Sequence, residues 1–236
     1  MYDVVGTYYN YEDIFKDINP EDKDGFSDKC ISLIQTNLND TSVFFSDKDC
    51  TKYMKYLKGL NMKGLIYKIS YGCIYLYYKI YLDMFKNKTI SYTPQKFYRK
   101  FLENSHDDNI LGICKDYLNE IIQVTLEKMD KLIDLYKIYN NIKSNEDCNF
   151  FSQCVALYND NLMLCRIDND HEFCNELEKF RYTYEARVAS LNCVGMPRTL
   201  ESTKPFDSFV ILLPFTIILI TSFILFILYK VDKNFN

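Results

Sequence analysis

Nine cysteines are the residues of this 236-residue chain best suited to chemistry. Cysteine at this density is unusual in the reducing cytosol and common in proteins of oxidising compartments, where it forms disulfides. We predict that eight of the nine pair with one another, and the sequence leaves their connectivity open. The candidate disulfide cysteines are Cys30, Cys50, Cys114, Cys148, Cys154, Cys165, Cys174 and Cys193. Cys73 is the candidate for the unpaired cysteine, which would be a free thiol or would form an intermolecular bridge.

Two of these cysteines and a nearby histidine raise the question of a metal site. Cys165, His171 and Cys174 lie close together in the sequence and supply ligand types that zinc prefers. Structural zinc sites, however, usually contain cysteine pairs with about two to four intervening residues, whereas five residues separate Cys148 from Cys154. We therefore favour disulfides and predict no metal site.

Motifs of enzyme active sites are absent from the sequence. There is no Gly-x-Ser-x-Gly elbow, Walker loop or dinucleotide fingerprint, all of which require glycine, and the chain has only 7 glycines. His106 lies beside Asp107 in a polar stretch typical of a solvated loop, and Asp168 and Asp170 resemble part of a calcium loop that lacks its glycine and distal glutamate. We predict no enzyme activity, catalytic residues, cofactor or small-molecule substrate.

Composition favours a helical fold, and the charge distribution argues against a nucleic-acid partner. The chain contains 21 Tyr and 17 Phe but only 7 Gly and 5 Pro, a balance that favours helices over a turn-rich β-sandwich or barrel. The net charge is −4, and Lys and Arg are scattered among Asp and Glu. Because a phosphate backbone requires a concentrated basic face, we predict no nucleic-acid binding.

Apolar residues recur at helical spacing along most of the chain. The most apolar stretch before the C-terminal region is 65–85, but Lys68 and Lys79 leave only ten uncharged residues between them, too few to cross a bilayer. We predict that this stretch is a central core helix. The predicted helices cover 22–39, 46–59, 65–85, 94–102, 118–136, 148–158 and 172–191.

The segment Phe209–Tyr229 is uncharged and predicts one transmembrane helix. A helix of that length spans about 30 Å, the thickness of the hydrocarbon core of a bilayer. The N-terminus lacks the features of a cleavable signal peptide, so this segment would also direct the chain to the membrane. Its orientation stays open, because Arg198 and Lys204 on one side are matched by Lys230 and Lys233 on the other.

The resulting fold class is mainly α. We expect a multi-helix, disulfide-stapled and cysteine-containing ectodomain over 1–193 and a short stalk over 194–208. These would be followed by one C-terminal transmembrane helix over 209–229 and a short tail over 230–236.

One run of residues resembles a known protein family. The run beginning at Phe173 resembles the Phe-Cys-x-Glu-Leu-x-x-Phe-x-x-x-Tyr signature of the Plasmodium interspersed repeat (PIR) superfamily, especially its Vir-like members. The matching residues are Phe173, Cys174, Glu176, Leu177, Phe180 and Tyr184. The block around Cys50, the Leu-Tyr stretch 131–136 and the pair Cys148 and Cys154 also resemble family blocks, so the similarity covers nearly the whole chain.

The resemblance implies a non-enzymatic variable surface protein. Such a protein is exported to the membrane of the infected red cell, where it serves host-cell contact or immune evasion. The implied partners are a membrane and a host receptor or antibody. Two departures from the family pattern concern the region after the helices: the tail 230–236 is short and the stalk 194–208 is short.

A rival hypothesis fits the same segment at 209–229. A tail-anchored protein with a cytosolic helical domain, serving trafficking or membrane tethering, would also end shortly after its membrane helix. It predicts reduced thiols instead of disulfides. A membrane-tethered enzyme is a third hypothesis, and it would need an active-site cleft.

Overall fold

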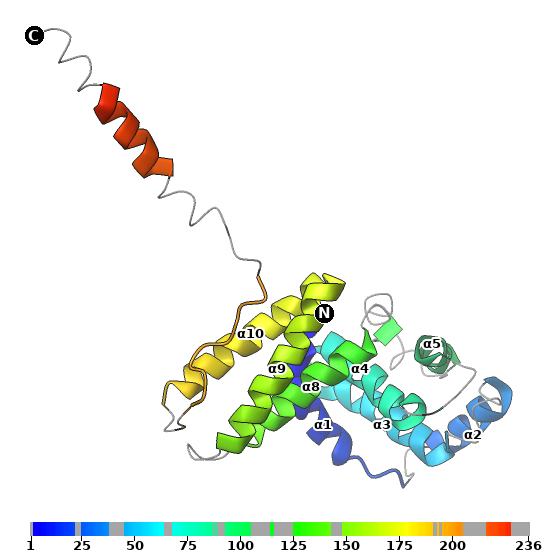
Figure 1. Ribbon diagram of the computed structural model, residues 1–236. Helices are drawn as coiled ribbons and strands as arrows, with labels where there is room; N and C mark the ends of the chain where they lie inside the picture. Colours follow the sequence, from blue (N-terminus) through cyan, green and yellow to red (C-terminus); the bar gives the residue numbers. More distant parts are fainter. Residues whose placement is uncertain are drawn as a thin grey trace, which may run out of the picture.

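The computed structural model is mainly helical (Figure 1). It describes residues 2–21, 25–37, 45–63, 68–86, 88, 93–104, 114–115, 125–142, 148–190, 193, 195–204 and 216–227. The elements are a 3₁₀-helix η1 (Tyr2–Thr7), α1 (Tyr8–Lys16), α2 (Phe26–Asn37), α3 (Asp47–Lys63), α4 (Ile69–Ile80), a π-helical turn η3 (Tyr81–Phe85), α5 (Pro94–Asn104), α8 (Leu126–Asn140), α9 (Cys148–Asp168) and α10 (His171–Val188). The all-α prediction is confirmed.

The helices form two lobes, one containing α1 to α5 and the other α8, α9 and α10 (Figure 1). Between them lies η1, which packs against α1 and α4 on one side and against α8 and α10 on the other. Among the described residues, no helix of one lobe packs as extensively against a helix of the other. The N-terminal segment is therefore the main joint between the lobes.

Both apolar and polar side chains fix η1 in this position. Val4 and Val5 are fully buried, and Tyr2 donates a hydrogen bond to Asp170 and accepts one from the backbone N–H of Thr125. Asp3 forms an ion pair with Lys179 of α10. The sequence analysis missed both η1 and α1, because six residues of 3₁₀-helix and nine of α-helix are each too short to show an extended periodicity.

Tyrosine fills much of the core of the N-terminal lobe. Tyr11, Tyr56 and Tyr98 are fully buried, and each hydroxyl donates to a backbone carbonyl, those of Lys68, Gly72 and Cys73. A buried tyrosine needs such a partner because an unpaired hydroxyl in an apolar core costs about 1–3 kcal/mol. The aromatic composition is thus used for packing.

The predicted central helix over 65–85 corresponds to α4 and η3. Eight of its α4 residues are buried, while Tyr75 and Tyr78 donate 2.6 Å hydrogen bonds to Glu12 and Asp130. A β-carbon at Gly72 would lie 2.5 Å from a methyl of Leu60, so glycine at this position lets α3 and α4 approach closely. Residues 64–67 lie outside the described part of the chain.

The remaining predicted helices are found with different ends. Helix α3 continues past Gly59 to Lys63, and α9 extends ten residues beyond the predicted end at 158, to Asp168. Of the predicted helix over 118–136, residues 118–124 lie outside the described residues, and α8 runs from Leu126 to Asn140. The extension of α9 follows from Leu162 and Cys165, which continue its buried stripe.

Four disulfides are present, which confirms the disulfide prediction. They join Cys30 to Cys50, Cys73 to Cys114, Cys148 to Cys193, and Cys165 to Cys174. Their Cα–Cα distances of 5.4–5.7 Å lie in the usual range for disulfides. Each bridge lies within one lobe or in the segment that directly follows it.

The expectation that Cys73 is the unpaired thiol is wrong. Cys73 bonds to Cys114, and Cys154 is the free cysteine. Cys154 is buried on α9 near Tyr184 and Arg187, and the other eight cysteines are all paired with one another. The linear spacing of the cysteines contains no information about this placement.

The predicted transmembrane helix over 209–229 is also corrected. In this region the structure describes a helix only over 216–227, which is about 18 Å long at 1.5 Å per residue. Its large apolar side chains are 45–69% exposed. Nowhere in the described part of the chain is a helix both long and apolar enough to span a bilayer, which contradicts the single-pass anchor and the localisation inferred from it.

Candidate functional site

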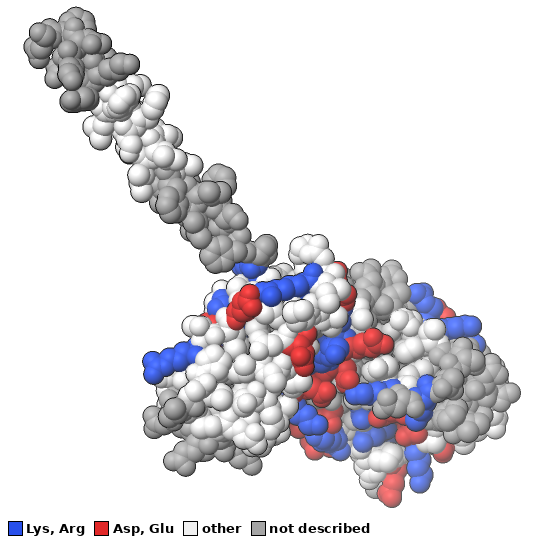
Figure 2. Space-filling model, in the orientation of Figure 1, with Lys and Arg blue, Asp and Glu red and all other residues white. Residues whose placement is uncertain are grey.

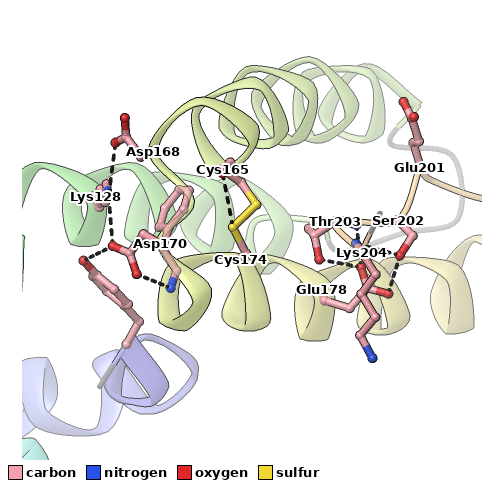
Figure 3. The surroundings of a disulfide bond; sticks show 12 residues. Lys128, Cys165, Asp168, Asp170, Cys174, Glu178, Glu201, Ser202, Thr203 and Lys204 are labelled. Carbon is pink, nitrogen blue, oxygen red and sulfur yellow. Dashed lines mark hydrogen bonds and ion pairs between the residues drawn. A yellow bond between two sulfur atoms is a disulfide. The ribbon is translucent and has the colours of Figure 1, made fainter. Parts of the chain in front are cut away.

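The most distinctive surface feature lies where α9 ends, α10 begins and the segment 197–204 passes over both helices (Figure 3). We call the segment 197–204 the strap. The Cys165–Cys174 disulfide joins the last turns of α9 to the first turn of α10. The site is therefore built from three pieces of chain that a covalent bond and the strap hold together.

Two ion pairs with a lysine of α8 stabilise the turn between α9 and α10. The carboxylates of Asp168 and Asp170 lie 3.1 and 2.9 Å from the ammonium group of Lys128, which is 12% exposed. Asp170 is also the N-cap of α10 and accepts a 3.1 Å hydrogen bond from the backbone N–H of Phe173. Both aspartates that resembled a calcium loop are thus engaged with a lysine. No group of three metal-binding side chains occurs among the described residues.

The strap includes residues predicted as a stalk, and it packs against the helices. Leu200 is only 7% exposed, and its backbone N–H donates to Glu185 at 3.0 Å. Tyr158 and Tyr184 donate to the carbonyl oxygens of Glu201 and Pro197. These contacts fix the strap along its length.

Glu178 of α10 lies against the strap and accepts three hydrogen bonds from it (Figure 3). Its carboxylate accepts hydrogen bonds from the backbone N–H and the hydroxyl of Thr203 and from the hydroxyl of Ser202, and it pairs with Arg181 at 2.7 Å. Burial alone would raise its pKa, but the hydrogen bonds from Arg181, Thr203 and Ser202 outweigh burial and lower the pKa to about 2. The charged form of Glu178 is therefore the form that holds the strap.

Replacing Glu178 by Gln is expected to lower the free energy of unfolding by about 2 kcal/mol at pH 7, because the amide loses the charge that Arg181 and the strap donors satisfy. The pKa of Glu178 is lower in the folded state than in the unfolded state. Its stabilising contribution is therefore complete above the unfolded value of 4.5 and is lost as the pH falls toward about 2. Urea denaturation at pH 7 and pH 3 measures both effects.

Glu103→Gln is the matched control, because Glu103 is exposed on α5. It should change the free energy of unfolding by less than about 0.5 kcal/mol. A difference between wild type and Glu178→Gln that is as large at pH 3 as at pH 7 would contradict the role assigned to the carboxylate.

A pocket of about 650 Å³ opens beside the disulfide, between the helix ends and the strap. Its size is within the range of small-molecule sites. Its lining residues are Cys165, Arg166, Asn169, His171, Cys174, Asn175, Glu201, Ser202, Thr203 and Lys204. The lining contains one arginine, one lysine and one carboxylate. Arg166 and Glu201 form an ion pair, so the positive charge of Lys204 is not balanced by a carboxylate of the lining.

The six residues of the family-like motif lie on α10. Five of them face the core and are at most 3% exposed: Phe173, Glu176, Leu177, Phe180 and Tyr184. Phe180 contacts the rings of Tyr136, Tyr139 and Tyr158, which belong to α8 and α9. The motif is thus the packing stripe of α10, and only Cys174 reaches the pocket.

Of the other residues singled out from the sequence, Cys165, His171 and Cys174 meet at this pocket, while His106 lies outside the described residues. The sulfurs of Cys165 and Cys174 are bonded to each other, so neither is a thiolate ligand for zinc. Sequence reasoning missed Arg166, Glu178 and the strap. The polar run 201–204 after a helix gave no sign that it folds back onto that helix.

Comparisons with known proteins give this site no precedent. No protein-family model matches the chain, and neither the curated proteins nor the solved structures contain a match.

Proposed function

We propose that this chain is a helical binding domain displayed outside the reducing cytosol, where it contacts a host receptor or an antibody and does not act as an enzyme on that partner. The proposal agrees with the resemblance of its motif to the PIR superfamily. The observation that carries it is the set of four disulfides, which account for eight of the nine cysteines. Such bonds persist in oxidising compartments and are rare in the cytosol.

A surface suited to contact with a partner lies on α9. Within this helix only Asp160, Arg166 and Asp168 are charged, and Figure 2 shows a broad area without charged atoms over it. Met163 and Ile167 are 57% and 74% exposed. Exposed apolar side chains in an area depleted of charge are typical of the centre of protein–protein interfaces.

The charged groups on this side of the molecule lie mainly away from α9. Figure 2 shows them gathered between the lobes. Asp130 of α8 also forms an ion pair with Lys86, which follows η3 of the other lobe. A charged border beside an uncharged area supports binding of a macromolecule, since interface rims are polar and interface centres are not. We assign the outer face of α9 as the contact surface.

The test is binding of the oxidised full-length chain, fluorescently labelled, to red cells and to antibodies from exposed hosts. Ile167→Glu is expected to weaken saturable binding at least about tenfold, because a charge placed at the centre of an interface is costly to desolvate. Ile31→Glu is the matched control, since Ile31 is a 41% exposed apolar residue on α2, and binding should be unchanged. Absence of saturable binding, or equal binding by the reduced and alkylated chain, would refute the proposal.

A further inference from the structure

The Cys165–Cys174 bridge has surroundings unlike those of the two core disulfides. All four cysteines of the Cys30–Cys50 and Cys73–Cys114 bridges are fully buried. By contrast, Cys174 is only partly buried, and both it and Cys165 lie on the wall of the 650 Å³ pocket. A solvent-borne reagent can therefore reach this bridge without unfolding the helices.

The two ends of the bridge differ in access. Cys165 is 3% exposed, whereas Cys174 is partly exposed in the first turn of α10. Thiol–disulfide exchange depends on which sulfur a thiolate can reach. Attack at the sulfur of Cys174 is the accessible route.

The pocket also favours one charge of reagent. Lys204 and Arg166 are the cationic groups on its wall, and Glu201 offsets Arg166, so the fixed charge of these groups is positive. His171 and the amides of Asn169 and Asn175 add hydrogen-bonding groups. These groups match a small thiol that bears carboxylates.

We propose that the Cys165–Cys174 bridge is a site of thiol–disulfide exchange for a small acidic thiol of the glutathione type. The thiolate of the reagent attacks the Sγ atom of Cys174, the Cys165–Cys174 bond breaks, and Cys165 leaves as a thiolate that takes a proton from water. The product is a mixed disulfide between the reagent and Cys174, with the reagent lying in the pocket. Attack by Cys165 on this mixed disulfide reverses the step and releases the thiol, so no oxidant or reductant is consumed.

The buried thiol of Cys154 does not compete in this exchange. Burial raises the pKa of Cys154 to about 12, which keeps the thiol protonated and unreactive at neutral pH. The four bridges therefore do not reshuffle through it in the folded protein.

The experiment measures opening of each disulfide in the oxidised full-length chain by acid quenching, alkylation and peptide mass mapping. Three thiols are compared: anionic 3-mercaptopropionate, neutral 2-mercaptoethanol and cationic cysteamine. The Cys148–Cys193 bridge is the internal control, because its cysteines are also partly exposed. The ratio of the opening rates of the two bridges removes the intrinsic reactivity of each thiol.

We expect this ratio to be about tenfold higher for 3-mercaptopropionate than for cysteamine, because one thiol is attracted and the other repelled by the pocket. We also expect the trapped reagent on Cys174 and a free thiol at Cys165. Lys204→Gln should lower the ratio about threefold for 3-mercaptopropionate and leave it unchanged for 2-mercaptoethanol, while Glu201→Gln should raise it for the anionic thiol. Arg99→Gln, an exposed change on α5, should have no effect.

Three results would overturn the proposal. The first is opening of Cys148–Cys193 as fast as Cys165–Cys174 with the anionic thiol. The second is a ratio of the two opening rates that is the same for all three thiols. This comparison needs only the wild-type chain, so it does not depend on whether a variant folds. The third is reagent trapped on Cys165 instead of Cys174.

Discussion

Replacing Val4 by Asp is expected to lower the free energy of unfolding by about 4 kcal/mol. Val4 is fully buried in η1, where the N-terminal segment packs between the two lobes. The substitution removes an apolar side chain from the core and places a carboxylate there without a partner. Urea denaturation followed by far-UV circular dichroism measures the loss.

Gly6→Asp is the matched control for this variant. Gly6 belongs to the same segment, is exposed and has open space where a β-carbon would lie. The same charge at this position should cost less than about 0.5 kcal/mol. If Val4→Asp lost less than about 1 kcal/mol, or if both variants lost the same amount, η1 would not be the joint between the lobes.

Removal of the Cys73–Cys114 bridge by a double substitution to Ala is the second large expected effect, also about 4 kcal/mol. The bridge closes a separation of 41 residues, and its loss increases the conformational freedom of the unfolded chain accordingly. Both cysteines are fully buried, and Cys73 lies on the central helix α4. Thermal and urea denaturation of the oxidised chain measure the change.

The double substitution of Cys165 and Cys174 to Ala provides the comparison. The Cys165–Cys174 bridge joins residues only nine positions apart. Its removal is therefore expected to lower the free energy of unfolding by about 2.5 kcal/mol. The Cys73–Cys114 variant should therefore be the less stable of the two. The opposite order would show that local contacts, and not the length of the closed loop, determine what each bridge contributes.

Much of the helical architecture could be predicted because it depends on local periodicity. In α10, Phe173, Leu177, Phe180 and Tyr184 recur every three or four residues, and all four are buried. The same rule identified the core helix α4 in spite of Lys79, whose ammonium group pairs with Asp83 one turn further along the chain. Patterns of this kind need no information about distant residues.

Features that depend on contacts between distant residues could not be predicted. The position of η1 depends on Asp170 and Lys179, more than 160 residues away, and the choice between Cys73 and Cys154 as the free thiol depends on which helices face each other. The candidate site follows the same rule, because Ser202 and Thr203 reach Glu178 only after the strap folds back onto α10.

The prediction at 209–229 failed for another reason. Hydropathy measures the solubility of a segment in lipid, whereas a span also needs a continuous helix of sufficient length. Within the described residues of this region the helix covers 216–227, which is shorter than a span requires. The apolar composition of 209–229 does not by itself establish a membrane helix.

The position of η1 has a consequence for the order in which the protein folds during synthesis. Every disulfide joins cysteines at most 45 residues apart, so each can form soon after the ribosome has released its second cysteine. Residues 2–7 leave the ribosome before all the helices that follow them, yet Asp170, the partner of Tyr2, is 168 positions further along the chain. The N-terminal segment must therefore wait for α10 before it can complete its contacts, and the slow closure of this long loop would join two lobes that are already oxidised.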